Sequence, residues 1–134
     1  MPYTYSNVDN LDKTEKVGSE QCVALVQYYA GAPNTAKWDE GESVLGNKNI
    51  AKGTAIATFV DGKYPNLSHG NHAALFISQE THGIWVMDQW IDNAPEGKKK
   101  KPYVSKRFIT SKGKWKDGTY VDPSNNADAF SVIK

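Results

Sequence analysis

The sequence predicts an α+β fold, in which one early helix packs on an antiparallel sheet of about five strands. Two observations predict it. A single helical stretch with a Gly-then-Pro stop occurs early, and from Gly53 onward short runs rich in β-branched and aromatic residues alternate with turn residues. A helix followed by a run of strands is typical of an antiparallel sheet covered on one face. The 134 residues are expected to form a single domain, 1–134.

The helix is expected to begin at Ser19 and to stop at Gly31-Ala32-Pro33. Ser19 is a favoured N-cap residue, because its hydroxyl can accept a hydrogen bond from an unpaired backbone N–H. Glu20 places a negative charge near the positive end of the helix dipole. Counted from Ser19, Cys22 falls in the first turn of this helix.

Five strands are expected in the second part of the chain. Their residue ranges are 54–60, 71–78, 83–91, 103–109 and 129–133. Before them, residues 34–52 have the composition of a loop with a short helix, pinned by Trp38. The four lysines at 98–101 indicate a solvated loop rather than a binding patch.

Composition argues against several classes of protein. The net charge of +1 provides no bulk positive field for nucleic acid. One cysteine excludes an intrachain disulfide, and one Cys with three His at no close spacing is a poor zinc signature, so no metal or cofactor is expected. The N-terminus lacks the basic and apolar regions of a signal peptide, and no apolar run reaches the length of a membrane span.

Cys22 has two interpretations. With Leu25, Val26 and Tyr29 it follows the i, i+3, i+4, i+7 spacing of one helix face, which predicts a small buried hydrophobic residue. A thiol in the first helical turn also lies near the positive end of the dipole, which favours the thiolate and therefore nucleophilicity. A base and an orienting group elsewhere in the chain would favour the second interpretation.

The three histidines differ in the secondary structure that is expected around them. His82 lies in a turn between two expected strands, and His69 lies in a loop. His72 opens a strand, where alternation places it on the face of Ala74 and Phe76. His72 is therefore the expected base, although a hydrogen-bonded structural histidine is the alternative.

The pairing of two strands predicts the orienting group. If Ser78 pairs with Ile84, paired residue numbers sum to 162 and Asp88 lies diagonal to His72. An acid on an otherwise apolar strand is costly to bury without a partner, and imidazole is the obvious one. An odd sum would instead place Gln89 on the face of His72.

Three short motifs follow one another between residues 17 and 91. They are Gln21-Cys22 at the start of a helix, Asn-His-Ala-Ala-Leu-Phe at 71–76 at the start of a strand, and Val-Met-Asp-Gln-Trp at 86–90 on the next strand. In this order they resemble the CHAP family, the cysteine, histidine-dependent amidohydrolases/peptidases of the papain-like superfamily. Departures are Asn71 in place of glycine, Asp88 where glutamate is usual, and Trp90 where an asparagine is expected.

The resemblance implies a papain-like, CHAP-type fold and hydrolysis of amide bonds in peptidoglycan peptides. Cys22 would be the nucleophile, His72 the base and Asp88 the orienting acid. The oxyanion would be met by the Cys22 backbone N–H, with Gln21 as a candidate second donor. Side chains expected to contact substrate are Trp38, Gln89 and Trp90.

The resemblance further implies an antibacterial toxin delivered by a type VI secretion system. Such a protein is made in the bacterial cytoplasm without a signal peptide and acts in the periplasm of a target cell. Its partners would be the peptidoglycan peptide substrate and a cognate immunity protein. Two alternatives remain: a papain-like protease, deamidase or acyltransferase with another substrate, and a non-catalytic binding module that uses Trp38, Trp85 and Trp90 as its surface.

Overall fold

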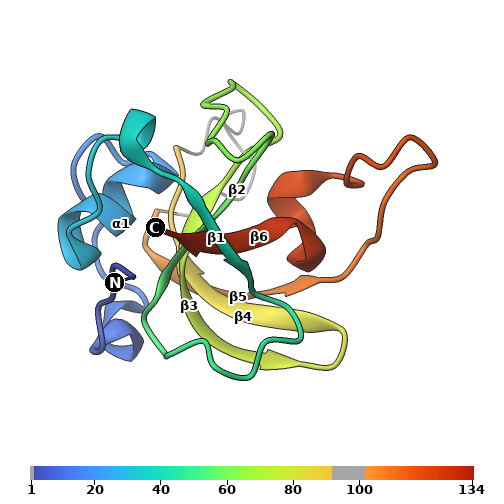
Figure 1. Ribbon diagram of the computed structural model, residues 1–134. Coiled ribbons are helices and arrows are strands. Elements are labelled where there is room, and N and C mark those ends of the chain that lie inside the picture. The colour runs from blue at the N-terminus through green and yellow to red at the C-terminus, as the bar shows by residue number, and fades with distance from the viewer. Residues whose placement is uncertain (1, 92–101) are drawn as a thin grey trace, which may run out of the picture.

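The computed structural model describes residues 2–91 and 102–134, so the lysines at 98–101 lie outside the described residues. One α-helix, α1 (Cys22–Ala30), lies beside a six-stranded antiparallel sheet with strand order β1-β6-β2-β3-β4-β5 (Figure 1). The strands are β1 (Glu40–Ser43), β2 (Ala55–Thr58), β3 (Ala73–Glu80), β4 (Gly83–Asp88), β5 (Ser105–Thr110) and β6 (Phe130–Ile133). The described residues also include four 3-10 helices: η1 (Val8–Leu11), η2 (Thr35–Lys37), η3 (Pro123–Asn125) and η4 (Ala127–Ala129). No helix in the described ranges has the length and apolar character needed to span a bilayer.

The α+β prediction is confirmed, but the helix begins later than expected. Its N-cap is Gln21, in extended backbone, and Cys22 is the first helical residue. Ser19 lies in the preceding turn, because Gly18 (φ +59°) and Glu20 (φ +70°) adopt left-handed backbone angles that interrupt a helix. The expected stop is correct: Gly31 (φ +75°) closes the helix and its N–H donates to the Val26 carbonyl.

The five expected strands are present, each within a few residues of its predicted bounds, and β1 is the sixth. The sequence Glu-Gly-Glu-Ser of β1 has no alternating apolar pattern, because this edge strand is mostly exposed. Just before β1, Asp39 exchanges two backbone hydrogen bonds of 2.9 Å with Lys134, which tie this edge to the end of β6.

The sheet buries apolar side chains on both faces. On one face Leu25 and Val26 of α1 belong to a cluster with Ala73, Leu75 and Ile77 of β3. The other face carries a second cluster from alternate strand positions, which includes Ile56, Ala74, Phe76, Val86, Ile109 and Phe130. Full burial of an aliphatic or aromatic side chain contributes about 1.5–3 kcal/mol, so the two clusters fix the position of β3 between them.

Gly53 allows the packing of the N-terminal segment on the sheet to be tested. Its backbone is left-handed (φ +90°), its carbonyl accepts from Tyr5 N–H at 2.8 Å, and an added Cβ would lie 2.1 Å from the Tyr5 carbonyl oxygen. We expect Gly53→Ala to lower the free energy of unfolding by about 3 kcal/mol or more, measured by urea denaturation.

The matched control is Gly46→Ala, at nearly the same φ (+89°) but with no atom within 4 Å of the added Cβ. Gly46→Ala should lower the free energy of unfolding by only about 1 kcal/mol, because only the left-handed backbone angle opposes the new side chain. Equal losses in the two variants would show that close packing of the N-terminal segment on Gly53 is not what stabilises this region.

Candidate active site

Cys22 stands at the N-terminus of α1, partly buried, and is the first residue of the helix. The N–H groups of a first helical turn have no partner within the helix, and together they present partial positive charge. This placement is closer to the helix end than the sequence predicted. It strengthens the argument that the helix stabilises a thiolate at this position.

The turn before Cys22 is held by Gln89, the residue that follows β4. The Gln89 side chain accepts from Val17 N–H (3.0 Å) and donates to the carbonyls of Val17 (3.1 Å) and Gln21 (2.8 Å). Only 1% of Gln89 is exposed. The expectation that Gln89 contacts substrate is therefore wrong, and so is the alternative in which it orients His72.

His72 is bound to Asp88 instead. His72 Nε2 lies 2.7 Å from Asp88 Oδ2, and both side chains are buried. The same Asp88 oxygen accepts from Arg107 Nε at 2.7 Å. The other oxygen, Oδ1, has no hydrogen-bond partner among the described residues. The carboxylate thus directs its hydrogen bonding through one oxygen to two cationic groups.

The register of β3 on β4 explains the contact between His72 and Asp88, although the residue pairing Ser78–Ile84 assumed from the sequence is wrong. Ser78 pairs with Trp85 rather than Ile84, because the register shifts by one residue between Phe76 and Ser78. Beyond that irregularity Phe76 pairs with Val86, so the sum of 162 holds at the end of the hairpin where His72 and Asp88 lie.

His72 also interacts with Cys22. Since Nε2 faces Asp88, Nδ1 is the ring nitrogen left for the thiol. Burial alone would raise the pKa of the Cys22 thiol, but the side chains of His72 and Tyr64 and the backbone N–H of Ala73 lower it below its ordinary value. Burial alone would lower the pKa of His72, but Asp88 and Cys22 raise it to about 9. These opposite shifts favour a thiolate and an imidazolium at neutral pH.

Asp88 stays ionised within the protein. Burial raises the pKa of its carboxyl, but hydrogen bonding and charge from His72 and Arg107 outweigh burial and lower it. An ionised carboxylate fixes the tautomer of His72, and its negative charge favours the protonated ring.

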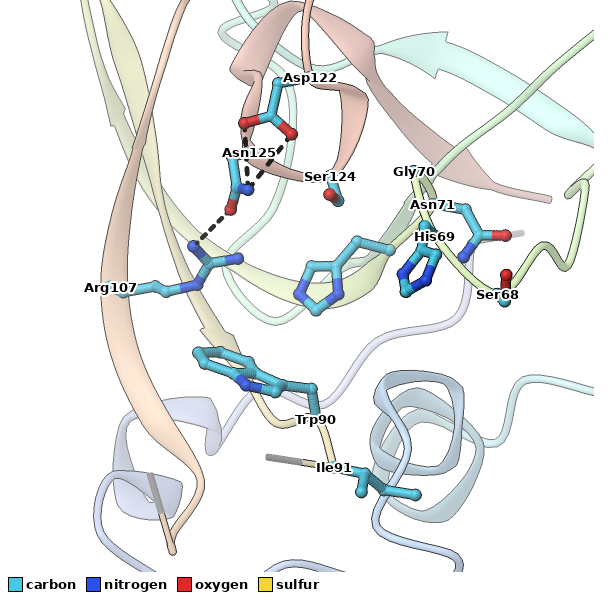
Figure 2. A pocket seen from close by; sticks show the side chains of 11 residues that line it. Ser68, His69, Gly70, Asn71, Trp90, Ile91, Arg107, Asp122, Ser124 and Asn125 are labelled. Carbon is cyan, nitrogen blue, oxygen red and sulfur yellow. Dashed lines mark hydrogen bonds between the residues drawn. The ribbon is translucent and has the colours of Figure 1, made fainter. Parts of the chain in front are cut away.

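A cleft of about 560 Å³ opens beside His72 (Figure 2). Trp90 forms part of its wall, with its ring in a T-shaped arrangement with His72 (centroids 6.4 Å apart) and the Arg107 guanidinium over its ring at 5.2 Å. Arg107 Nη1 donates to Asn125 Oδ1 at 3.1 Å, as the dashed line in Figure 2 shows. The opposite wall is formed by the loop of residues 68–71.

Two expectations based on tryptophan are wrong. Trp38 is completely buried: its Nε1 donates to the Pro33 carbonyl (2.8 Å) and its ring packs on Tyr64 (centroids 4.9 Å apart), so it cannot contact substrate. The surface expected for the binding-module alternative loses Trp38 for the same reason, whereas Trp85 is only partly buried and packs on Phe108. Trp90 lines the cleft, and its contact with substrate stays a prediction.

The other two histidines have different surroundings from His72. His82 packs on Phe108 at the hairpin turn (centroids 5.5 Å apart) and is exposed. His69 lines the cleft from the 68–71 loop. Within residues 2–91 and 102–134, no three metal-binding side chains gather in a cluster.

Sequence reasoning missed two residues of the site. Arg107 pairs across the sheet with Val86, so strand parity places it on the face of Asp88, and this signal could have identified it. The hydroxyl oxygen of Tyr64 lies 3.8 Å from Cys22 Sγ, but no motif or residue spacing in the sequence links these two residues.

Comparisons with known proteins agree with this geometry. Residues 4–133 match the family described as domesticated amidase effector 2. The chain is 51% identical to the type VI secretion amidase effector 2 protein of Salmonella typhi, over 100% of both chains. It is 40% identical to domesticated amidase effector 2 of Ixodes scapularis, over 88% of this chain and 73% of that protein. A solved structure of type 6 secretion amidase effector 2 superposes with a TM-score of 0.89 at 50% identity, over 100% of this chain and 95% of that one.

The role of Gln89 can be tested on the thiol itself. Gln89→Met keeps the side-chain length but removes all three hydrogen bonds to the turn before Cys22. We expect the free energy of unfolding to fall by about 2–3 kcal/mol and the alkylation rate of Cys22 by iodoacetamide to fall about tenfold, well below the melting temperature.

Gln79→Met is a matched control. The Gln79 side chain makes the same set of three bonds to a distant loop: it accepts from Gly46 N–H (2.7 Å) and donates to the carbonyls of Val44 (3.3 Å) and Asn47 (2.8 Å). This variant should lose stability without a change in thiol reactivity. Equal alkylation rates in the two variants would exclude a positioning role for Gln89.

Proposed function

The chain belongs to the domesticated amidase effector 2 family, and from this membership we propose a cysteine amidase that hydrolyses amide bonds in peptidoglycan peptides as an antibacterial toxin. The observation that carries the proposal is the His72–Asp88 pair, hydrogen-bonded at 2.7 Å, whose imidazole interacts with Cys22 at the N-terminus of α1 and lines an open cleft. A thiol, a base and an orienting acid in this arrangement are what acyl transfer requires.

In the proposed reaction, the Cys22 thiolate attacks the carbonyl carbon of the scissile amide. A tetrahedral intermediate forms, and the protonated His72 ring gives its Nδ1 proton to the amide nitrogen as the C–N bond breaks. The amine leaves and an acyl thioester remains on Cys22. His72, now neutral, takes a proton from water, the hydroxide attacks the thioester, and the acid product leaves as the Cys22 thiolate is restored.

Asp88 and Arg107 act on this reaction through His72. Asp88 holds Nε2, so Nδ1 stays directed to the thiol in every step, and the negative charge stabilises the imidazolium that donates to the leaving amine. Arg107 keeps that carboxylate ionised and fixed. Both are positioning residues, since neither lies at the reacting atoms.

Substrate peptides would lie in the cleft between the 68–71 loop and the wall formed by Trp90 and Arg107. The Cys22 backbone N–H, at the free end of the helix, is the first donor proposed for the oxyanion. Gln21, next to it, has an exposed side chain and was the sequence-based candidate for the second donor.

Delivery follows from the same family membership. The Salmonella typhi relative and the solved structure are both named type VI secretion amidase effectors. We propose that this chain is made in the bacterial cytoplasm, is delivered by such a system and acts in the periplasm of a target cell. A cell that makes this toxin would need a cognate immunity protein.

The nucleophile and base are tested on purified peptidoglycan, with released fragments identified by chromatography and mass spectrometry. We expect Cys22→Ala and His72→Ala to lose about 1000-fold or more of the hydrolysis rate while remaining folded. His82→Ala, at the exposed hairpin turn, is the matched control and should keep most activity. Substantial hydrolysis by Cys22→Ala would refute the proposed mechanism.

The dependence of kcat/KM on pH tests whether Cys22 and His72 act as a thiolate and an imidazolium. We expect kcat/KM to rise at a pH below the ordinary thiol pKa, as Cys22 ionises, and to fall near pH 9, as His72 loses the proton needed by the leaving amine. Asp88→Asn removes the charge that holds this proton, so the alkaline limb should move to lower pH and the maximum rate should drop about 100-fold or more.

Asp39→Asn changes an exposed acid paired with Lys63 and should leave the profile unchanged. An unshifted alkaline limb in Asp88→Asn would mean that Asp88 does not set the proton affinity of His72.

A further inference from the structure

Tyr64 places a phenol hydroxyl against the nucleophile. Its oxygen lies 3.8 Å from Cys22 Sγ, and its side chain is buried. We propose that Tyr64 is a catalytic residue, whose O–H is the second donor to the oxyanion of the tetrahedral intermediate. The inference rests on the proposed role of Cys22 as nucleophile and adds a group that the reaction described above leaves unidentified.

The Tyr64 hydroxyl has a proton to donate throughout the working pH range. Burial, followed by the negative charge and hydrogen bonding of Cys22, raises the pKa of its phenol. Among the described residues, Cys22 is the partner that this hydroxyl reaches. When Cys22 is the thiolate, the Tyr64 O–H is the donor of this contact, because a thiolate can only accept.

In the proposed reaction, the Cys22 sulfur stops being a charged hydrogen-bond acceptor. When the thiolate attacks, the Sγ–C bond forms, the sulfur loses its negative charge and the carbonyl oxygen gains it. That oxygen is bonded to the same carbon as Sγ, only two covalent bonds from the sulfur. A donor aimed at Sγ can therefore follow the charge to the oxyanion with a small rotation, and its hydrogen bond becomes strongest where charge develops.

Tyr64 is also better fixed than Gln21. Its ring packs on Trp38 (centroids 4.9 Å apart), and Trp38 is itself held by the Pro33 carbonyl. The Gln21 side chain is exposed, so its ordering in the transition state would cost conformational entropy. A preorganised donor stabilises an oxyanion without that cost.

Tyr64→Phe, made in the full chain, tests the inference because it removes the hydroxyl and keeps the ring. Two rates are compared: hydrolysis of purified peptidoglycan fragments, which forms an oxyanion, and alkylation of Cys22 by iodoacetamide, which does not. We expect kcat to fall about 100-fold with little change in KM. The alkylation rate should change less than about threefold.

Three outcomes would overturn the inference. Hydrolysis and alkylation that fall in parallel would mean that Tyr64 only stabilises the thiolate. Hydrolysis within about threefold of wild type would exclude any catalytic role. A loss of about 100-fold in Gln21→Ala, with Tyr64→Phe unaffected, would assign the oxyanion donor to Gln21.

Tyr29→Phe is the matched control, since Tyr29 lies on α1 and its ring packs on Tyr5 (centroids 5.0 Å apart). It should alter neither rate. Wild type and Cys22→Ala in the same assay separate the two proposals. If wild type hydrolyses and Tyr64→Phe does so equally, only the role of Tyr64 fails. If Cys22→Ala is as active as wild type, the proposed function fails as well.

Discussion

The site depends on two consecutive residues at the end of β4 that point to opposite faces of the sheet. Asp88 faces the side where it binds His72 at 2.7 Å, and Gln89 faces the side where it holds the turn before Cys22 with three hydrogen bonds. Because side chains alternate along a strand, one short stretch of backbone fixes both the proposed base and the proposed nucleophile. The thiol and the imidazole are held in a common frame, although 49 residues separate them in the sequence.

Two buried ionisable groups, His72 and Asp88, and two partly buried ones, Arg107 and Cys22, are tolerated in one place because their charges alternate. Arg107 is positive, Asp88 negative, His72 positive when protonated and Cys22 negative as the thiolate, and each interacts with the next. The four charges sum to zero, and each group offsets part of the desolvation cost of its neighbour. An isolated buried Asp88 would raise its own pKa and take up a proton. Arg107 thus contributes to the reactivity of a thiol that it does not touch.

The fold and the core of the site were predictable because their signals are local. The helix stop, the strand runs and the parity of Asp88 relative to His72 all follow from short-range spacing. Gln89 and Trp38 were assigned to substrate because a polar or aromatic side chain near a motif looks available, and only tertiary contacts show that both are buried. The polar edge strand β1 and the left-handed turn at Glu20 were missed because neither has an apolar period.

The segment between β2 and β3 is closed by hydrogen bonds at its two ends and carries part of the cleft wall between them. At its base, Thr58 N–H donates to the His72 carbonyl and His72 N–H donates to Thr58 Oγ1, both at 3.0 Å, so the backbone of the proposed base is tied to β2. The loop between them carries Tyr64, which packs inward, and residues 68–71, which line the cleft. Because the closing hydrogen bonds lie outside residues 65–71, changes in that stretch can reshape the cleft while His72 stays in register with Asp88. A loop closed in this way separates the cleft wall from the proposed reacting groups: residues 68–71 of the wall lie on the loop, and Cys22 and His72 are held by the helix and the sheet.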